Sequence, residues 1–159
     1  MNISILCVGK LKESYWRDAV AEYAKRLSKY CKLEIIEVED EKNPDKSTAG
    51  TDKQCMEKEM ERLKRYIRGN TYLISMAIEG RKTDSVGFAN HISELLVRGE
   101  SDITFLIGGS LGIASELKQQ SRELISFSDM TFPHQVMRVL LLEQIYRAYR
   151  ILNHEPYHK

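Results

Sequence analysis

Short apolar runs rich in β-branched residues recur along the chain and are separated by longer segments of mixed character. They cover residues 2–8, 33–38, 71–78, 103–107 and 124–127, and Glu79 with Gly80 ends the third. Such runs, bounded by glycine and polar residues, are typical of β-strands. The run at 103–107 is almost unbroken, as in a strand buried on both faces of a parallel sheet. The pattern therefore predicts five strands.

Between these runs, apolar residues follow helical spacing or lie between helix start and stop signals. Helices are predicted over residues 14–29, 51–68, 85–97, 114–120 and 133–152. Thr51 followed by Gln54 is a capping-box pattern, which places the start of the second helix at Thr51. Gly99 ends the third helix, and Pro133 begins the last one.

Two segments carry more specific expectations. Tyr15 and Trp16 start the apolar set of the first helix, so both are expected to lie against the core. The acidic, polar stretch after Val38 contains Pro44 and Gly50, and it is expected to form a loop.

Strands that alternate with helices predict an α/β fold, in which helices cover both faces of a parallel or mostly parallel sheet. The chain has 159 residues without an internal repeat or a linker, which fits a single domain over residues 1–159. Hydrophobic residues make up 42% and charged residues 30%, a composition that supports a full core and excludes a disordered tail. The pattern does not determine the order of the strands.

The last helix is apolar on nearly every face. Its apolar residues are Val136, Met137, Val139, Leu140, Leu141, Leu142, Ile145, Tyr146, Ala148, Tyr149, Ile151 and Leu152. A helix of this kind must be buried on all sides, and a dimer interface is the natural way to bury it. Arg138 lies within the stretch, so it is expected to meet a carboxylate, a ligand or an RNA phosphate.

Charge and cysteine usage exclude several classes of protein. The 24 basic and 23 acidic residues leave a net charge of +1, so the chain does not hold nucleic acid by bulk charge alone. The apolar runs are too short to span a bilayer, and no signal peptide is evident. Three separated cysteines without a CxxC pair, and histidines without metal spacing, predict no metal site and a reducing, cytoplasmic location.

Basic residues nevertheless gather in the first part of the chain. Up to Leu33 there are seven basic and three acidic residues, and residues 34–45 then carry six acids and one lysine. A solvated helix face explains the first cluster as well as RNA binding does. Near the C-terminus, arginines and histidines beside Tyr146, Tyr149 and Tyr157 would suit RNA, through phosphate pairing and base stacking.

Three predicted strand ends carry unusual residues, and ligands of open α/β sheets bind beyond such ends. These ends are residues 75–80, 106–112 and 126–134. The glycines around Gly108 allow a ligand to approach closely, or they form a plain loop. In the last segment, phenylalanines and Met130 form an apolar slot, or a tight strand-to-helix loop. No GxGxxG follows the first strand and no Walker A lysine is present, which argues against a nucleotide-binding, flavodoxin-like protein.

Four stretches together resemble one known family. They are ISILCVGKLKESYW near the start, FLIGGSLG, LISFSDMTFPHQVMRVLLLEQIYRAYRI and the terminal PYHK. In these stretches the chain resembles the RlmH family, small SPOUT-class methyltransferases that modify pseudouridine in large-subunit ribosomal RNA. The resemblance extends over essentially the whole chain.

The resemblance implies an α/β fold with a C-terminal trefoil knot, and a homodimer formed largely through the last helix. It also implies that S-adenosylmethionine binds in the knot, held by three loops that coincide with the three strand ends. The family's cofactor positions fall on Met76, Gly108, Phe127, Ser128, Asp129, Met130, Thr131 and Phe132. Met76 replaces a common leucine, a swap that conserves volume. Asp129 occupies a variable position, so its contact is expected through the backbone.

The implied reaction is methylation of N3 of a pseudouridine in 23S ribosomal RNA. The net charge of +1 favours the assembled ribosome over free RNA as the substrate. The N3 proton must leave, and Arg138, Tyr157 and His158 are candidates to assist. The tail follows the helix implied to form the dimer, so it could complete the partner's pocket. The alternative is a non-catalytic ribosome-binding or assembly protein with the same knotted, dimeric fold.

Overall fold

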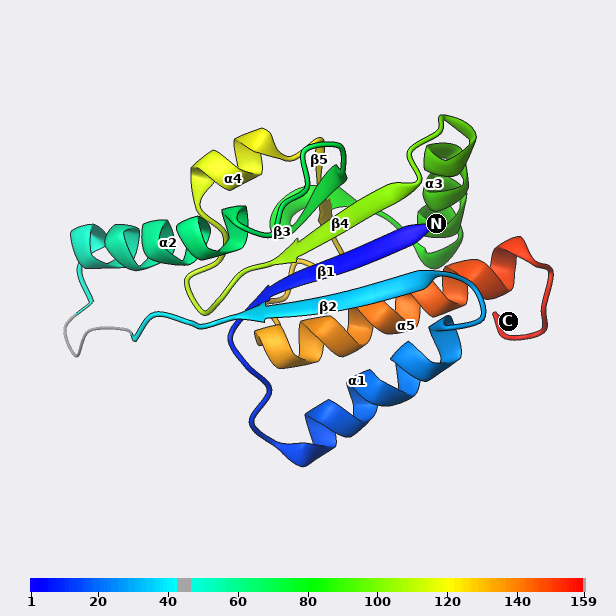
Figure 1. Cartoon of the computed structure of the whole chain (residues 1–159), viewed down its shortest axis with the longest axis horizontal. Helices are drawn as coiled ribbons and strands as arrows, with labels where there is room; N and C mark the ends of the chain where they lie inside the picture. The colour runs from blue at the N-terminus through cyan, green and yellow to red at the C-terminus, as the bar shows by residue number, and fades with distance from the viewer. Residues whose placement is uncertain (43–46, 159) are drawn as a thin grey trace.

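The computed structural model describes residues 1–42 and 47–158; Pro44 of the predicted loop and Lys159 of the terminal motif lie outside these residues. The described part contains one parallel sheet with the strand order β2-β1-β4-β3-β5 (Figure 1). Its strands are β1 (Asn2–Val8), β2 (Lys32–Val38), β3 (Tyr72–Lys82), β4 (Asp102–Ile107) and β5 (Glu123–Ser126). All four pairings are parallel, which confirms the predicted α/β fold.

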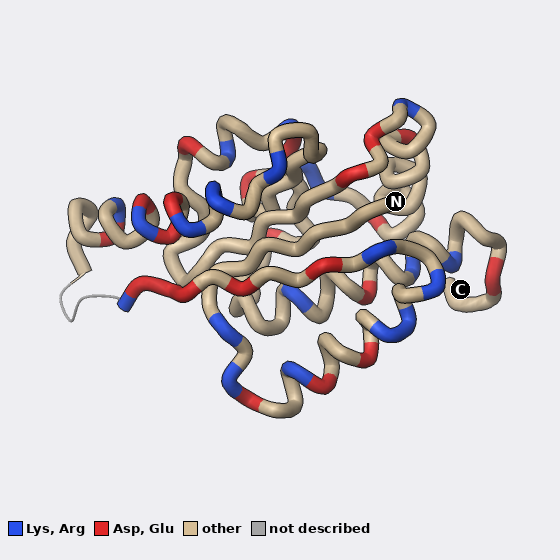
Figure 2. Tube along the Cα trace, in the orientation of Figure 1, with Lys and Arg blue, Asp and Glu red and all other residues tan. Residues whose placement is uncertain are grey.

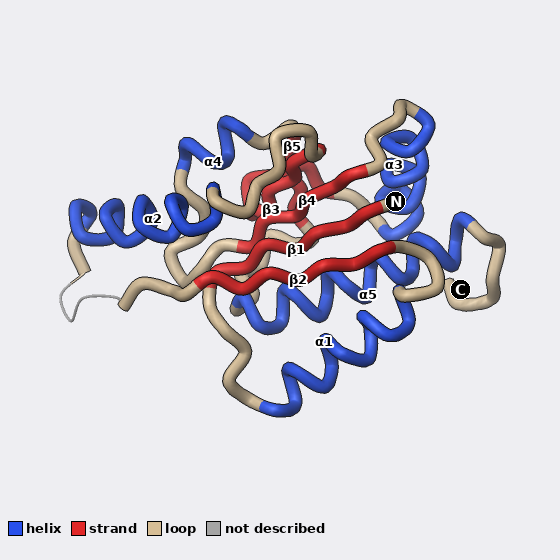
Figure 3. Tube along the Cα trace, in the orientation of Figure 1, coloured by secondary structure: helices blue, strands red, loops and turns tan. Residues whose placement is uncertain are grey.

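Helices cover both faces of this sheet, as expected. They are α1 (Ser14–Leu27), α2 (Ala49–Lys64), α3 (Ser85–Val97), α4 (Ser115–Gln120) and α5 (His134–Leu152). Figure 3 shows α1 and α5 on one side of the strands and α2 and α4 on the other. Successive residues of β1 point to opposite faces: Ile5 joins the core formed with α1, α3 and α5, and Leu6 joins the core formed with α2 and α4.

The start of α2 differs from the prediction. Thr48, not Thr51, is the N-cap: its side-chain oxygen accepts from the backbone N–H of Thr51 at 3.2 Å. The Thr51 hydroxyl in turn accepts from the N–H of Thr48 at 2.9 Å. Thr51 therefore fills the role that Glu or Gln has in the usual capping box, and the helix begins one turn earlier.

The third strand continues beyond its predicted end at Glu79-Gly80. A register shift lies between Met76 and Arg81, and pairing with β5 resumes after it. A Cβ on Gly80 would lie 2.6 Å from the carbonyl carbon of Leu124, so the two backbones approach too closely for a side chain. Gly80 thus allows β3 to continue through the register shift, where the sequence predicted the end of the strand.

The expectation for Tyr15 was wrong, since 62% of this residue is exposed. Trp16 is partly exposed, and α1 packs on the core through Val20, Tyr23 and Leu27. The first turn of α1 therefore extends past the region that the core covers.

A single chain already buries much of α5, although the apolar pattern of this helix predicted that a second subunit is needed to bury it. Leu141, Leu142, Ile145 and Ala148 are fully buried in the core that α5 shares with α1 and α3. Tyr146 and Tyr149 are buried as well, whereas the apolar residues of the first two turns are only partly covered; these are Val136, Met137, Val139 and Leu140. In the described part of the chain, no helix has the length and apolar character needed to cross a membrane.

Candidate functional site

The register of the sheet brings the three unusual strand ends together. Met76 pairs with Ile107 of β4 on one side and with Ile125 of β5 on the other. Gly108 directly follows Ile107, and residues 127–132 follow β5. All eight predicted cofactor positions therefore gather at the carboxyl edge of β3, β4 and β5, where ligands of parallel sheets bind.

The glycine loop after β4 is closed by its own backbone. A Cβ on Gly108 would lie 2.5 Å from the carbonyl oxygen of Gly112 and 2.9 Å from Cγ1 of Ile113. Gly112 has a φ of +87°, and it forms an isolated bridge with Gly109. Gly108 is thus required by the shape of the loop itself, and the loop presents backbone groups in a preformed arrangement.

The loop after β5 is held by short-range hydrogen bonds. The hydroxyl of Ser126 donates to the carbonyl oxygen of Ser128 at 2.9 Å, and the hydroxyl of Ser128 accepts from the N–H of Met130 at 3.0 Å. Phe127 packs edge-on against Phe88 of α3, with ring centroids 5.6 Å apart. Met130 is 73% exposed. An ordered loop therefore presents apolar surface to solvent at the edge of the sheet.

The basic side chains at this edge are paired with carboxylates, so they do not leave a net charge that would repel a cationic ligand. Lys82 at the end of β3 forms an ion pair with Asp129, and Arg81 lies 3.6 Å from the carboxylate of Glu123. Each basic side chain at the end of β3 thus has a carboxylate partner. The Asp129 carboxylate is directed to Lys82, in keeping with a backbone role toward a ligand. Apolar surface, preformed backbone and paired cations together fit a sulfonium compound such as S-adenosylmethionine.

Both terminal nitrogens of the Arg138 guanidinium are held by protein groups, whereas its buried Nε has no hydrogen-bond partner among the described residues. Only 1% of its side chain is exposed, and its guanidinium pairs with Glu37 of β2. It also donates to the carbonyl oxygens of Val8, at 3.1 Å, and Gly9, and to Nδ1 of His134 at 2.9 Å. This placement favours a positioning role, in which Arg138 fixes the start of α5 to the ends of β1 and β2, over direct contact with RNA.

Sequence reading missed two further groups near this edge. His134, four residues before Arg138, contacts it on one helix face, and burial together with Arg138 lowers the pKa of His134. Glu59 of α2 is 6% exposed, and its carboxylate would lie 3.2 Å from a Cβ on Gly109. Burial raises the pKa of Glu59. The i, i+4 spacing of His134 and Arg138 could have identified their contact from the sequence. The approach of Glu59 to Gly109 depends on tertiary packing.

The structure separates the tail candidates from the cofactor positions. The Tyr157 hydroxyl donates to Glu143 at 3.3 Å, and the Arg147 guanidinium lies 4.7 Å from the centre of the Tyr157 ring. His158 lies 3.4 Å from the same arginine. Glu143 is nine residues beyond the start of α5, which corresponds to about 14 Å along the helix. Within one chain, Tyr157 and His158 therefore lie away from the three segments that carry the predicted cofactor positions. These segments, at Met76, Gly108 and residues 127–132, are called the cofactor loops below.

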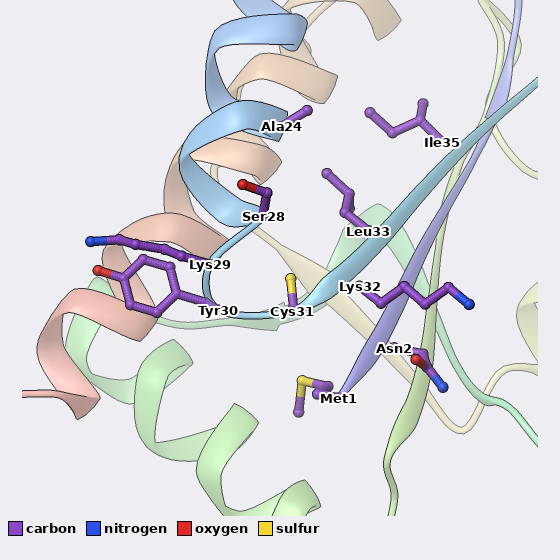
Figure 4. Close-up of a pocket in the computed structure, with 10 residues that line it drawn as sticks. All are labelled: Met1, Asn2, Ala24, Ser28, Lys29, Tyr30, Cys31, Lys32, Leu33 and Ile35. Atoms are coloured by element: carbon purple, nitrogen blue, oxygen red, sulfur yellow. The ribbon is translucent and has the colours of Figure 1, made fainter.

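A groove lies elsewhere in the molecule. It has a volume of 810 Å³ and lies between the end of α1 and the first residues of β1 and β2 (Figure 4). Cys31, Leu33 and Ile35 are among its lining residues. None of the predicted site residues lines it, and it is at the amino edge of the sheet, opposite the three loops.

Comparison with known proteins finds similarity over the full length. The family described as predicted SPOUT methyltransferase matches residues 1–158. Ribosomal RNA large subunit methyltransferase H of Clostridium tetani is 53% identical over 159 residues, covering 100% of both chains. The proteins of the same name from Clostridium acetobutylicum and Bifidobacterium adolescentis are each 52% identical over the same length.

A solved structure shares the fold. A probable methylase family protein from Haemophilus influenzae Rd KW20 matches with a TM-score of 0.56, covering 99% of this chain and 70% of that one. The two sequences are 11% identical, so the likeness concerns the fold alone.

Proposed function

Because the chain belongs to the SPOUT methyltransferase family, we propose that residues 1–159 form one methyltransferase domain that methylates N3 of a pseudouridine in 23S ribosomal RNA. S-adenosylmethionine is the proposed methyl donor. The observation that carries the proposal is the convergence of Met76, Gly108 and residues 127–132 at one edge of the sheet. The names of full-length relatives support ribosomal RNA of the large subunit as the substrate.

The proposed roles of the loops follow from their chemistry. Phe127, Met130 and Phe132 provide apolar surface for the adenine ring, and the backbone at Gly108 lies against the donor. When bound, S-adenosylmethionine supplies a methyl group that its positive sulfur already activates. The loops are ordered before binding, so this chain's contribution is to hold donor and acceptor in line and to exclude water.

A homodimer is proposed as the active form. Apolar positions of α1 and α5 that one chain leaves partly exposed support it, including Val20, Tyr23, Val139 and Leu140. The tail lies away from the cofactor loops of its own chain, so we assign Tyr157 and His158 to the partner's site. There they would assist loss of the N3 proton or stack on the base.

The assembled ribosome is the proposed substrate, and the cytoplasm the proposed location. A net charge of +1 gives little non-specific affinity for free RNA, so recognition depends on shape and local patches. Mass spectrometry of ribosomal RNA from cells that lack this gene tests the function. One missing methyl group on a large-subunit pseudouridine is expected, and an unchanged set of modifications contradicts the proposal.

The non-catalytic alternative differs in one measurable property. A ribosome-binding or assembly protein with this fold has no need of the methyl donor. Calorimetry with S-adenosylmethionine at high protein concentration therefore separates the two functions: binding heat supports the enzyme, and its absence supports the alternative.

A further inference from the structure

We propose that residues 10–17, which connect β1 to α1 and form the first turn of α1, are an RNA-contacting surface beside the cofactor loops. Tyr15 stacks on an unpaired base, and Lys12 pairs with a phosphate. The inference rests on the proposed function, because it assigns part of the ribosomal RNA substrate to a defined surface.

The first step is location. Gly9 follows β1 at the carboxyl edge of the sheet, with a φ of +89°. A Cβ there would lie 2.7 Å from Cε1 of His134, so the His134 ring packs directly on the Gly9 backbone. His134 is the first residue of α5 and follows the cofactor loop at 127–132 after one proline. The 10–17 segment therefore leaves the sheet next to that loop, as Figure 1 shows for the β1–α1 connection and the start of α5.

The second step is rigidity. The N–H of Leu11 donates to Glu37 at 3.3 Å, and Glu37 also holds Arg138. The Arg17 guanidinium donates to the carbonyl oxygens of Leu11, at 3.3 Å, and Lys12. One end of the connection is thus held by Glu37 of β2, which also binds Arg138 of α5. The other end is held by Arg17 of α1. A surface ordered in this way loses little conformational entropy when it binds.

The third step is what the segment presents. Tyr15 is 62% exposed and leans on Trp16, with ring centroids 5.2 Å apart. Lys12 is exposed and has no ion-pair partner among residues 1–42 and 47–158. Lys10 pairs with Glu39, but both side chains are largely exposed, so the pair is weak and exchangeable. Figure 2 shows these basic positions along the β1–α1 connection.

The chemistry of this surface fits single-stranded RNA. The segment holds three basic residues and one acid, with an open aromatic face between them. Aromatic stacking with cations at phosphate spacing is the usual way in which proteins hold unpaired bases. A subunit interface is the competing occupant, but the centre of such an interface is typically depleted of lysine. RNA is therefore the occupant that we assign.

The test uses ribosomes purified from cells that lack the gene, tritiated S-adenosylmethionine and full-length protein. Tyr15→Ala is expected to lower kcat/KM for ribosomes about tenfold, with Tyr15→Phe retaining most activity because it keeps the stacking ring. Lys12→Ala is expected to lower the salt dependence of kcat/KM, by about 0.7 in log–log slope. The affinity for S-adenosylmethionine should not change in any of these variants.

Matched controls come from two other parts of the chain. Tyr66→Ala removes a tyrosine that is 50% exposed after α2, and Lys32→Ala removes an exposed lysine at the start of β2. Both should keep wild-type kinetics.

The outcomes separate the two proposals. No methyl transfer by the wild-type protein refutes the proposed function. Transfer by the wild type with equal kcat/KM for Tyr15→Ala and Tyr66→Ala refutes the RNA surface alone. If Tyr15→Ala instead dissociates a dimer, as measured by sedimentation, the segment is a subunit interface and the inference is wrong.

Discussion

At the scale of single residues, Arg138 connects three segments that are far apart in sequence. Its guanidinium reaches Glu37 of β2, the carbonyl oxygens at the end of β1, and His134 at the start of α5. The arginine is almost wholly buried, so removing it leaves a carboxylate and backbone oxygens without their donor. The contact thus orders the residues that flank the cofactor loop.

Arg138→Ala is therefore expected to lower the free energy of unfolding by about 1–3 kcal/mol, the range for leaving buried polar groups without their donor. The Glu37 side chain is 29% exposed, so water partly compensates its charge. Chemical denaturation measures the change. Arg98→Ala is the matched control, because the Arg98–Glu94 pair is exposed on both sides and should contribute less than about 0.5 kcal/mol. Equal effects of the two substitutions would show that the buried network does not support the fold.

His134 gives the fold a pH dependence of known sign. Burial and Arg138 lower its pKa, so between that value and the ordinary value near 6.5 the unfolded chain binds more protons than the folded chain. Stability from this group is therefore complete above about pH 6.5 and is lost as the pH falls. Glu37, Asp40 and Glu13 also face the ring and oppose the shift.

His134→Asn keeps an acceptor near Arg138 and removes the titration. The free energy of unfolding of the wild type minus that of the variant should therefore rise with pH below 6.5, as measured by denaturation across the range. The pKa of Glu59 is raised, which is the opposite direction. Glu59 is present in both proteins, so its contribution to the pH dependence of stability cancels in the difference. A pH-independent difference would contradict the lowered pKa of His134.

At the scale of the elements, the glycine loop after β4 is the part of the site most sensitive to one added atom. Gly108→Ala places a methyl group 2.5 Å from the carbonyl oxygen of Gly112, so the loop must shift. We expect its affinity for S-adenosylmethionine to fall by at least about tenfold, since a displaced backbone group loses its contact with the ligand. Calorimetry measures this loss.

Gly69→Ala is the control for that substitution. Nothing lies within 4 Å of a Cβ at Gly69, and the residue is in a turn far from the edge that carries the site. Its affinity for the donor should equal that of the wild type. If both variants bind normally, the loop does not contact the donor.

Sequence alone predicted the elements well where local signals decide them. β1 (Asn2–Val8) and α3 (Ser85–Val97) were predicted with their observed bounds, because Gly9 ends the first, and Asp84 and Gly99 flank the second. The start of α2 was misplaced because two overlapping threonine patterns compete for the cap. Gly80 was interpreted as the end of the strand, because its close approach to the backbone of Leu124 cannot be predicted from the sequence.

The residues of the candidate site were assigned only through the resemblance. Local patterns singled out the three strand ends, but not their meeting point, because strand order does not follow from periodicity. The contacts of Arg138 with Val8 and Gly9 span most of the chain and could not be predicted locally. The trefoil knot implied by the family stays a prediction.

At the scale of the whole molecule, the tail and the cofactor loops occupy different ends of α5. If the tail serves the partner's site, two differently damaged chains should complement each other. One lacks residues 157–159 and the other carries Gly108→Ala. In a mixed dimer, one site combines intact loops with an intact tail and should regain activity.

The measurement is methyl transfer to ribosomes after the two damaged proteins are mixed, unfolded and refolded together, at a donor concentration too low for the Gly108→Ala site to bind. Recovery of about a quarter of wild-type activity is expected, because random pairing makes half the molecules mixed and each has one intact site. Each protein refolded alone is the control. Without recovery, the tail acts within its own chain or not at all.

A crystal structure of the protein with S-adenosylmethionine tests the central claim most directly. The account predicts the donor at the carboxyl edge of the sheet, in contact with Met76, the backbone at Gly108 and residues 127–132. A donor bound in the groove beside Cys31 and Leu33, with those three loops free of ligand, would contradict it.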